Sequence, residues 1–346
     1  MTSVIDLRSD TVTTPTPHMR RAMADARVGD DVYEEDPTIH ELEEKSRLLF
    51  QKESGLFFPT GTMANQAAIM AHTTPGDEVI VEEMMHVYMF EVGGMSYLAG
   101  VQPRLIPSAR GILSPEEVEM RIRPENIHFP TTSLICLENT HNLQGGTVLR
   151  EDDIAGVAAI AQKNQIALHL DGARIFNAAA YLETTVAELT KSCDSVMFCL
   201  SKGLSAPVGS VLVGDEALIT KARKCRKLLG GGMRQAGVIA AAGLVALDEM
   251  TERLVEDHVN ARILAEGLAK IPGIQIDLSR VQTNIVLFNK SQVPLSDQAF
   301  KDKLSEDGIQ FNLRGNGDVR MVTHKDVTRE QVESVVERVE SLLNSL

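Results

Sequence analysis

A single lysine, Lys202, follows an apolar run in the stretch FCLSKGLSAPVGS at residues 198–210, where a buried strand is expected to end. Asp171 follows another apolar run about 30 positions earlier, a spacing of roughly one helix and one strand in an α/β unit. The two side chains are therefore expected at neighbouring strand ends. Burying an unpaired ammonium is costly, so we interpret Lys202 as a nucleophile.

The sequence PTGTMANQ at residues 59–66 could hold a phosphate. Gly61 and Thr62 lie in a turn that enters a helix, and the free N–H groups and dipole of a helix N-terminus favour anions. A plain threonine-capped helix is the alternative. GxGxxG is absent from this stretch and GxxxxGK[ST] from the whole chain, so neither a dinucleotide-binding fold nor a P-loop is supported.

An amine, a carboxylate and a phosphate-binding helix terminus are together what pyridoxal 5'-phosphate requires. Lys202 would bind the aldehyde, Asp171 would keep the pyridine nitrogen protonated, and Gly61 and Thr62 would hold the phosphate. The order of these residues along the chain therefore predicts this cofactor.

Further polar residues follow other predicted strands. His86, in EEMMHVYMFE, could stack on an aromatic ring or move a proton near neutral pH, although a lone histidine is more often structural. The cluster at residues 138–142 is either a turn or a support for the site. Arg174 could pair with Asp171 or bind an anionic substrate.

The elements that must position these residues alternate between strand and helix patterns, which predicts a mostly parallel sheet covered by helices. A nearly continuous helical pattern from Met233 to about Ile271 places a domain boundary near residue 250. We expect a large domain at 1–250 and a small α+β domain at 251–346, with strands at 282–289 and 318–324 and a last helix from Arg329. The strands expected in the large domain are 55–58, 78–81, 133–137, 166–170, 195–200 and 210–214.

Composition excludes several classes of partner. The chain has 34 Lys and Arg against 48 Asp and Glu, a net charge of −14, which argues against nucleic acid and anionic membranes. The apolar segment at 237–247 is too short to span a bilayer. The four cysteines show no metal-binding spacing, so we expect a cytoplasmic or organelle-matrix enzyme that acts on a small molecule and has no structural zinc.

The sequence resembles the low-specificity L-threonine/L-allo-threonine aldolases, a β-eliminating lyase family of the aspartate aminotransferase fold (fold type I). That fold implies a mostly parallel seven-stranded sheet in the large domain. The resemblance covers nearly the whole chain and is carried by DLRSDTVT (6–13), VGDDVYEEDPT (28–38), PTGTMANQ (59–66), HLDGARIFNA (169–178), FCLSKGLSAPVGS (198–210) and GGGMRQAG (230–237).

The resemblance implies cleavage of a β-hydroxy-α-amino acid to glycine and an aldehyde. It makes Lys202 the Schiff-base lysine and Asp171 the partner of the pyridine nitrogen, and it places His86 over the cofactor ring. Another pyridoxal-dependent lyase, releasing ammonia and a keto acid, is the alternative. Met85 and Met89, where the family pattern differs, bear on substrate preference.

The resemblance further implies that Ser9, Arg174 and Arg320 hold the substrate carboxylate. It implies a homotetramer built from dimers with shared active sites, in which Tyr33 and Lys227 reach a neighbour's cofactor. The basic run at 221–227 could instead be a solvated helix face. For the β-hydroxyl proton, the sequence leaves two bases open, His86 and His128.

Overall fold

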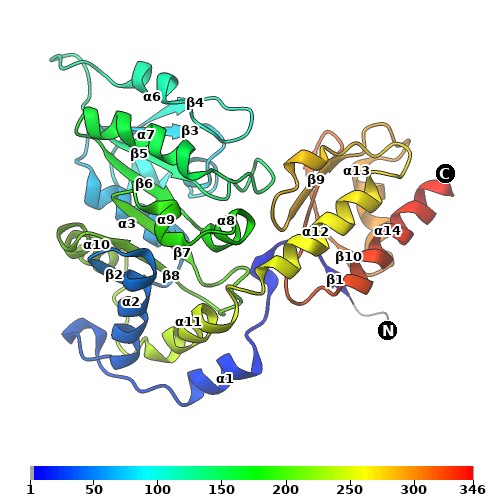
Figure 1. Cartoon of the computed structure of the whole chain (residues 1–346), viewed down its shortest axis with the longest axis horizontal. Coiled ribbons are helices and arrows are strands. Elements are labelled where there is room, and N and C mark those ends of the chain that lie inside the picture. Colours follow the sequence, from blue (N-terminus) through cyan, green and yellow to red (C-terminus); the bar gives the residue numbers. More distant parts are fainter. Residues whose placement is uncertain (1–3, 346) are drawn as a thin grey trace.

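The computed structural model describes residues 4–345, and its largest element is a seven-stranded sheet (Figure 1). β8 is antiparallel to both of its neighbours, β2 and β7, and the other pairs are parallel. The order across the sheet is β2 (Ser54–Phe58), β8 (Ser210–Gly214), β7 (Ser195–Cys199), β6 (Ala167–Asp171), β5 (Thr132–Glu138), β3 (Glu78–Glu82) and β4 (Gln102–Ile106).

Both faces of this sheet are buried, which explains why its strands read as continuous apolar runs. Successive side chains of a strand point to opposite faces. In β3, Ile80 joins one hydrophobic cluster, whereas Val79 and Val81 join another. The six strands predicted in this domain match β2, β3, β5, β6, β7 and β8, while β4 was missed because this edge strand, QPRLI, is only partly buried.

Helices connect and cover these strands, and most begin after a Ser, Thr or Asp cap. In chain order up to the sheet's last helix they are α1 (Pro17–Ala24), α2 (Pro37–Phe50), α3 (Gly61–His72), α4 (His86–Met89), α5 (Gly94–Tyr97), α6 (Pro115–Arg121), α7 (Glu151–Lys163), α8 (Ile175–Leu182), α9 (Val186–Thr190), α10 (Glu216–Leu228) and α11 (Gly237–Glu249).

A second, antiparallel sheet carries its own hydrophobic cluster. The N-terminal segment packs with it, since β1 (Ile5–Asp6) and β10 (Ile309–Gln310) form a separate parallel two-stranded sheet, and Ile5 and Leu7 join the same hydrophobic cluster before the chain crosses to α1 (Figure 1). Asp10 then contacts both Arg174, which follows β6, and Asn284, which lies next to the second sheet. The remaining elements are α12 (Leu254–Leu268), β9 (Ile285–Asn289), α13 (Asp297–Glu306), β11 (Asn312–Gly315), β12 (Asp318–Val322) and α14 (Arg329–Asn344).

The nearly continuous helix predicted from 233 to about 271 is wrong at residues 233–236, which precede α11, and at residues 250–253, where α11 ends before α12 begins. The interruption lets α11 pack against α1 and α2 while α12 packs against α14. α11 and α12 contribute side chains to two different hydrophobic clusters, and one straight helix would not reach both. Within residues 4–345, no helix has the length and apolar character needed to cross a membrane.

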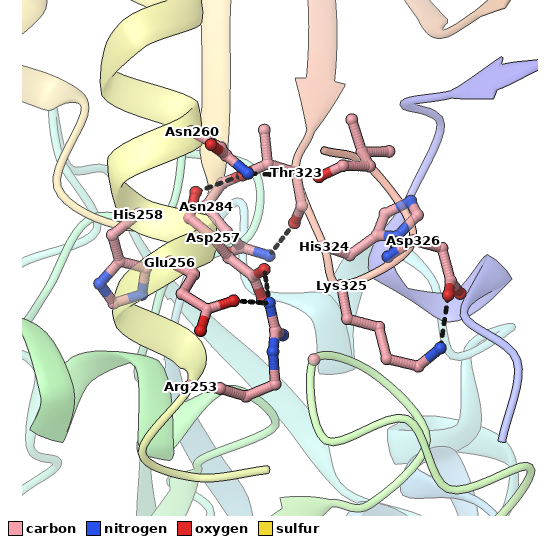
Figure 2. A network of polar contacts seen from close by, with 12 residues as sticks. Arg253, Glu256, Asp257, His258, Asn260, Asn284, Thr323, His324, Lys325 and Asp326 are labelled. Atoms are coloured by element: carbon pink, nitrogen blue, oxygen red, sulfur yellow. Dashed lines mark hydrogen bonds and ion pairs between the residues drawn. The ribbon is translucent and has the colours of Figure 1, made fainter. Parts of the chain in front are cut away.

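A polar network fixes α12 to the second sheet (Figure 2). Arg253 donates to both carboxylate oxygens of Asp257, at 2.8 and 3.2 Å. The Thr323 hydroxyl donates to the Asp257 carbonyl at 2.6 Å, and Asn284 Nδ2 donates to the Thr323 carbonyl at 3.1 Å. Since Asn284 Nδ2 also lies 3.2 Å from Asp10 Oδ2, this network reaches the N-terminal segment.

Replacing Arg253 with methionine should lower the free energy of unfolding by about 3 kcal/mol, because the fully buried Asp257 loses its counter-charge. Burial already raises the pKa of Asp257. When the pKa of a carboxyl is higher in the folded state than in the unfolded state, the folded protein becomes less stable as pH rises above the unfolded pKa. The stability lost by the Arg253 variant relative to wild type should therefore be larger at pH 8 than at pH 5. Urea unfolding at both pH values measures this. The double variant with Asp257→Asn should recover part of the loss, and an unrecovered loss would show that the charge is not its cause.

Candidate active site

A cavity of about 230 Å³ opens at the carboxyl ends of the parallel strands. Ligands bind at this edge in open α/β sheets. Five residues predicted from sequence line it together, namely Gly61, Thr62, His86, Asp171 and Lys202. The rest of the lining consists of Pro59, Thr60, Asn65, Glu91, Ala173, Met197, Cys199, Ser201, Pro207 and Val208.

Asp171 is the last residue of β6 and is almost completely buried. The Asn65 side-chain amide donates to its Oδ2 at 2.8 Å, and the backbone N–H of Ala173 donates to its Oδ1 at 3.1 Å. These donors fix the plane of the carboxylate while lone pairs remain for a cationic donor in the cavity. Lys202 follows β7, the strand beside β6, as its spacing from Asp171 predicts.

The start of α3 supplies the anion-binding side of the cavity. Thr60 caps this helix by accepting from the Met63 N–H, and Thr60, Gly61 and Thr62 line the cavity, so the uncapped N–H groups of the first turn lie at its wall. A Cβ on Gly61 would lie 2.9 Å from Cys199 Sγ and 3.1 Å from Met197 Cε. Only glycine therefore leaves room for close approach at this position.

These observations fit pyridoxal 5'-phosphate, the cofactor expected from the sequence. Gly61 and Thr62 offer a helix N-terminus for the phosphate. Asp171 offers a fixed carboxylate for a protonated ring nitrogen, and Lys202 offers an amine for the aldehyde.

His86 begins α4 and is held by Glu91, a residue that sequence reasoning missed. The His86 Nδ1 lies 2.9 Å from Glu91 Oε1, and the Glu91 side chain is fully buried. Asn65 and Gln66 donate to the same carboxylate at 2.9 and 2.7 Å. Although burial opposes it, the hydrogen bond that His86 donates to Glu91 raises the pKa of His86.

Replacing Glu91 with glutamine should lower the pKa of His86 and destabilise the folded protein by about 2 kcal/mol at pH 6, since a charged hydrogen bond is lost. The folded pKa of His86 is raised above its usual 6.5. Its contribution to stability is therefore complete below about pH 6.5 and is lost as pH rises through the folded pKa. Thermal unfolding of the cofactor-free protein from pH 5 to 9 measures the difference. Glu41→Gln, on the exposed face of α2, is the control, and equal profiles for both variants would contradict the assignment.

Arg174 is paired with Asp10, not with Asp171. Its Nε and Nη2 donate to the two Asp10 oxygens at 2.7 Å each, and both residues are buried. Despite burial, Arg174 holds the pKa of Asp10 far below its usual range. The Asp10 carboxylate occupies one edge of the guanidinium, so Arg174 is less free for a substrate than the sequence suggested.

Arg320 carries positive charge that protein carboxylates do not fully balance. Its Nη1 donates to the Arg8 carbonyl at 3.1 Å, and its Nη2 donates to Asn142 Oδ1 at 2.9 Å. Its Nε is buried without a hydrogen-bond partner among residues 4–345. Burial and the neighbouring charge of Arg174 lower the pKa of Arg320 to about 10. An anion bound here would relieve both effects.

Glu138 connects the His86 side of the site to the Arg320 side. Its two oxygens accept from the backbone N–H groups of His86 and Asn142 at 2.7 and 2.8 Å. Since Asn142 in turn accepts from Arg320, one buried carboxylate at the end of β5 positions both groups. The polar cluster predicted at 138–142 thus includes supports for the site.

Four other residues that were predicted to contribute to the site do not line the cavity of their own chain. His128 is exposed on the loop that precedes β5, at the opposite end of this strand from Glu138. Tyr33 is 71% exposed and Lys227 is exposed near the end of α10. Ser9 is half-buried beside Asp10, and its Oγ accepts from the Thr11 N–H at 3.2 Å.

Comparison with known proteins agrees with this geometry. The family described as Beta-eliminating lyase matches residues 6–291. Low-specificity L-threonine aldolase 1 of Arabidopsis thaliana is 44% identical over 334 residues, which are 95% of this chain and 93% of that protein. The low specificity L-threonine aldolase of Escherichia coli K12 is 43% identical over 333 residues, covering 96% and 97%.

Solved structures show the same fold at low sequence identity. A threonine aldolase of Leishmania major superposes with a TM-score of 0.82 at 20% identity, covering 97% of this chain and 98% of that one. Serine palmitoyltransferase of Sphingomonas wittichii superposes with a TM-score of 0.77 at 18% identity, covering 99% and 88%. The predicted fold type I architecture is confirmed.

Proposed function

The chain belongs to the Beta-eliminating lyase family, and on that premise we propose that it is a threonine aldolase dependent on pyridoxal 5'-phosphate. The reaction is the cleavage of L-threonine and L-allo-threonine to glycine and acetaldehyde. The observation that carries the proposal is the meeting of Lys202, Asp171 and the start of α3 in one cavity. This arrangement occurs in a chain whose relatives at 43–44% identity bear the aldolase name.

Pyridoxal phosphate, when bound, supplies an aldehyde that joins amines and a ring that accepts the electron pair of the broken Cα–Cβ bond. Lys202 would supply the amine that anchors it, and Asp171 would hold a proton on its ring nitrogen. Gly61 and Thr62 bind the phosphate through backbone N–H groups.

Arg320 is proposed to bind the substrate carboxylate, with Asn142 fixing the plane of its guanidinium. Arg174 and Ser9 complete the wall beside it, and Asp10 orients Arg174. Fixing the carboxylate would orient the bonds of Cα and thereby select which of them breaks.

The proton of the β-hydroxyl needs a base. When neutral, His86 donates from Nδ1 to Glu91, which leaves Nε2 as an acceptor at the cavity.

Turnover should then rise with pH through the His86 pKa, and Glu91→Gln should move this rise to lower pH. His128 could serve only from a neighbouring subunit, since it lies at the other end of β5 in its own chain.

We also propose a homotetramer built from dimers with shared sites, located in the cytoplasm. Apolar side chains beside His86 support an interface, because Val92 is 96% and Tyr97 87% exposed in the single chain. Tyr33 and Lys227 are exposed, as residues that reach a neighbour's cofactor must be.

The test is product analysis with L-threonine, L-allo-threonine and their D isomers in the presence of the cofactor. Glycine and acetaldehyde in equal amounts are expected from the L substrates. Ammonia and a keto acid would instead support the alternative, a lyase that eliminates at Cβ. Comparison of the two L substrates determines which diastereomer is preferred.

A further inference from the structure

A line of buried polar side chains extends from Asp171 away from the cavity. Asn65 donates through Nδ2 to Asp171 and to Glu91, at 2.8 and 2.9 Å. Asn65 Oδ1 lies 3.2 Å from Nε2 of His169, which is 1% exposed. His169 Nδ1 lies 2.8 Å from Ser195 Oγ. A second histidine, on α3, completes the line, since Nε2 of His72 lies 2.8 Å from the same hydroxyl.

One arrangement of protons satisfies all these contacts. The two carboxylates only accept, so the amide nitrogen of Asn65 must face them and its oxygen must face His169. His169 therefore carries hydrogen on Nε2 and accepts the Ser195 hydroxyl proton at Nδ1. Ser195 in turn accepts from Nε2 of His72. Rotating the Asn65 amide by half a turn would place its oxygen against two carboxylates.

The surroundings of His169 keep its ring neutral. The groups that face it are Asn65, Ser195, the His72 ring at a centroid distance of 6.4 Å, and Asp171, two residues on along β6. Burial lowers the pKa of His169 to about 3 and that of His72 to about 4. At neutral pH, both rings therefore have the single N–H that the hydrogen-bond directions demand.

We propose that His169 is a positioning residue, which as a neutral Nε2–H imidazole locks the Asn65 amide and thereby holds the Asp171 and Glu91 carboxylates in place. Asn65 lines the cavity, and His169 fixes it from behind. Asp171 faces the place of the cofactor's ring nitrogen, and Glu91 pairs with His86. By fixing Asn65, His169 therefore fixes the positions of both carboxylates. This inference rests on the proposed function, in which Asp171 holds the cofactor.

The first test is cofactor binding to the cofactor-free protein. His169→Phe keeps a flat ring but removes both hydrogen bonds, and it should raise the dissociation constant of pyridoxal phosphate about tenfold. It should also shift the pH midpoint of the visible absorption band of the bound cofactor. His169→Gln retains an amide donor for Asn65 and should return the dissociation constant to within about threefold of wild type. His18→Phe, at an exposed histidine on α1, is the matched control.

A purely structural role would lower the unfolding temperature of His169→Phe without moving the absorption midpoint, and that result would overturn the proposal. If His169→Phe does not fold, Ser195→Ala removes the partner that holds His169 Nδ1 and should weaken cofactor binding in the same direction. Unchanged binding and spectra in Ser195→Ala would count equally against the proposal.

The second test needs no cofactor. Nitrogen-15 spectra of histidine-labelled, cofactor-free protein should show His169, assigned by its loss in His169→Gln, as the neutral Nε2–H tautomer at pH 6. An Nδ1–H tautomer or a cation at that pH would refute the assignment. If wild-type protein fails to bind the cofactor, the proposed function fails, whereas the tautomer result still decides the hydrogen-bond chain.

Discussion

Replacing Lys202 with alanine should lower kcat for glycine release about 10³-fold, because the variant keeps the cavity but loses the lysine amine that lines it. Lys202→Arg should be impaired to a similar extent, since a guanidinium keeps the charge but does not form the covalent link. Wild-type protein that has been reduced with borohydride should carry the cofactor on the peptide that contains Lys202. Rate measurement and mass spectrometry test both statements.

Lys303→Ala is the control for this prediction, because Lys303 is an exposed lysine on α13, a helix that packs in the second hydrophobic cluster. It should retain wild-type turnover and the same modified peptide. Full turnover in Lys202→Ala, or cofactor attached elsewhere in the wild type, would refute the assigned role of Lys202.

The sequence was sufficient to bring Lys202, Asp171 and Gly61 together because a parallel sheet places the carboxyl ends of its strands at one edge. Each residue directly follows an apolar run or opens the next helix, so position along the chain translates into position in space. The search for apolar runs missed β4, because this edge strand has a partly polar sequence and no continuous apolar run. Sequence reasoning also failed at residues 250–253, where packing against two cores ends a helix that the local pattern would continue.

Residues that act through partners distant in the sequence could not be found in this way. Asp10 contacts Arg174 across 164 positions, and Asn65 contacts Asp171 across 106. Neither pairing leaves a local pattern, although Asp10 lies in the DLRSDTVT motif and Glu91 lies in the first turn after the His86 helix. Their local signal is an acidic residue close in sequence to a candidate site residue, as Asp10 is to Ser9 and Glu91 is to His86.

The buried acids of the site have separate tasks, because each is matched to a different donor. Asp10 neutralises Arg174, Glu91 pairs with His86, and Glu138 binds two backbone N–H groups. Asp171 accepts from one amide side chain and one backbone N–H. Glu138 has the same number of donors but does not line the cavity, so Asp171 is the cavity carboxylate with capacity left for the cofactor, and Arg320 is the cation with capacity left for the substrate.

Replacing Asp171 with asparagine should therefore produce the second large loss, about 10²- to 10³-fold in kcat. The neutral side chain cannot hold a proton on the ring nitrogen, so electrons released at Cα are stabilised less. Its amide nitrogen would also face either Asn65 Nδ2 or the Ala173 N–H, donor against donor. The cofactor should bind more weakly than it does in His169→Phe, because Asp171 contacts the cofactor and His169 acts through Asn65.

Steady-state kinetics with L-threonine and titration of the cofactor-free variant measure the two effects of Asp171→Asn. Asp194→Asn is the matched control, since Asp194 is exposed and accepts from the Leu168 N–H near the amino end of the same strand. It should retain turnover within about twofold, because surface changes alter stability little. An Asp171→Asn enzyme with normal kcat would show that the ring nitrogen needs no carboxylate, and the role of His169 behind it would fall as well.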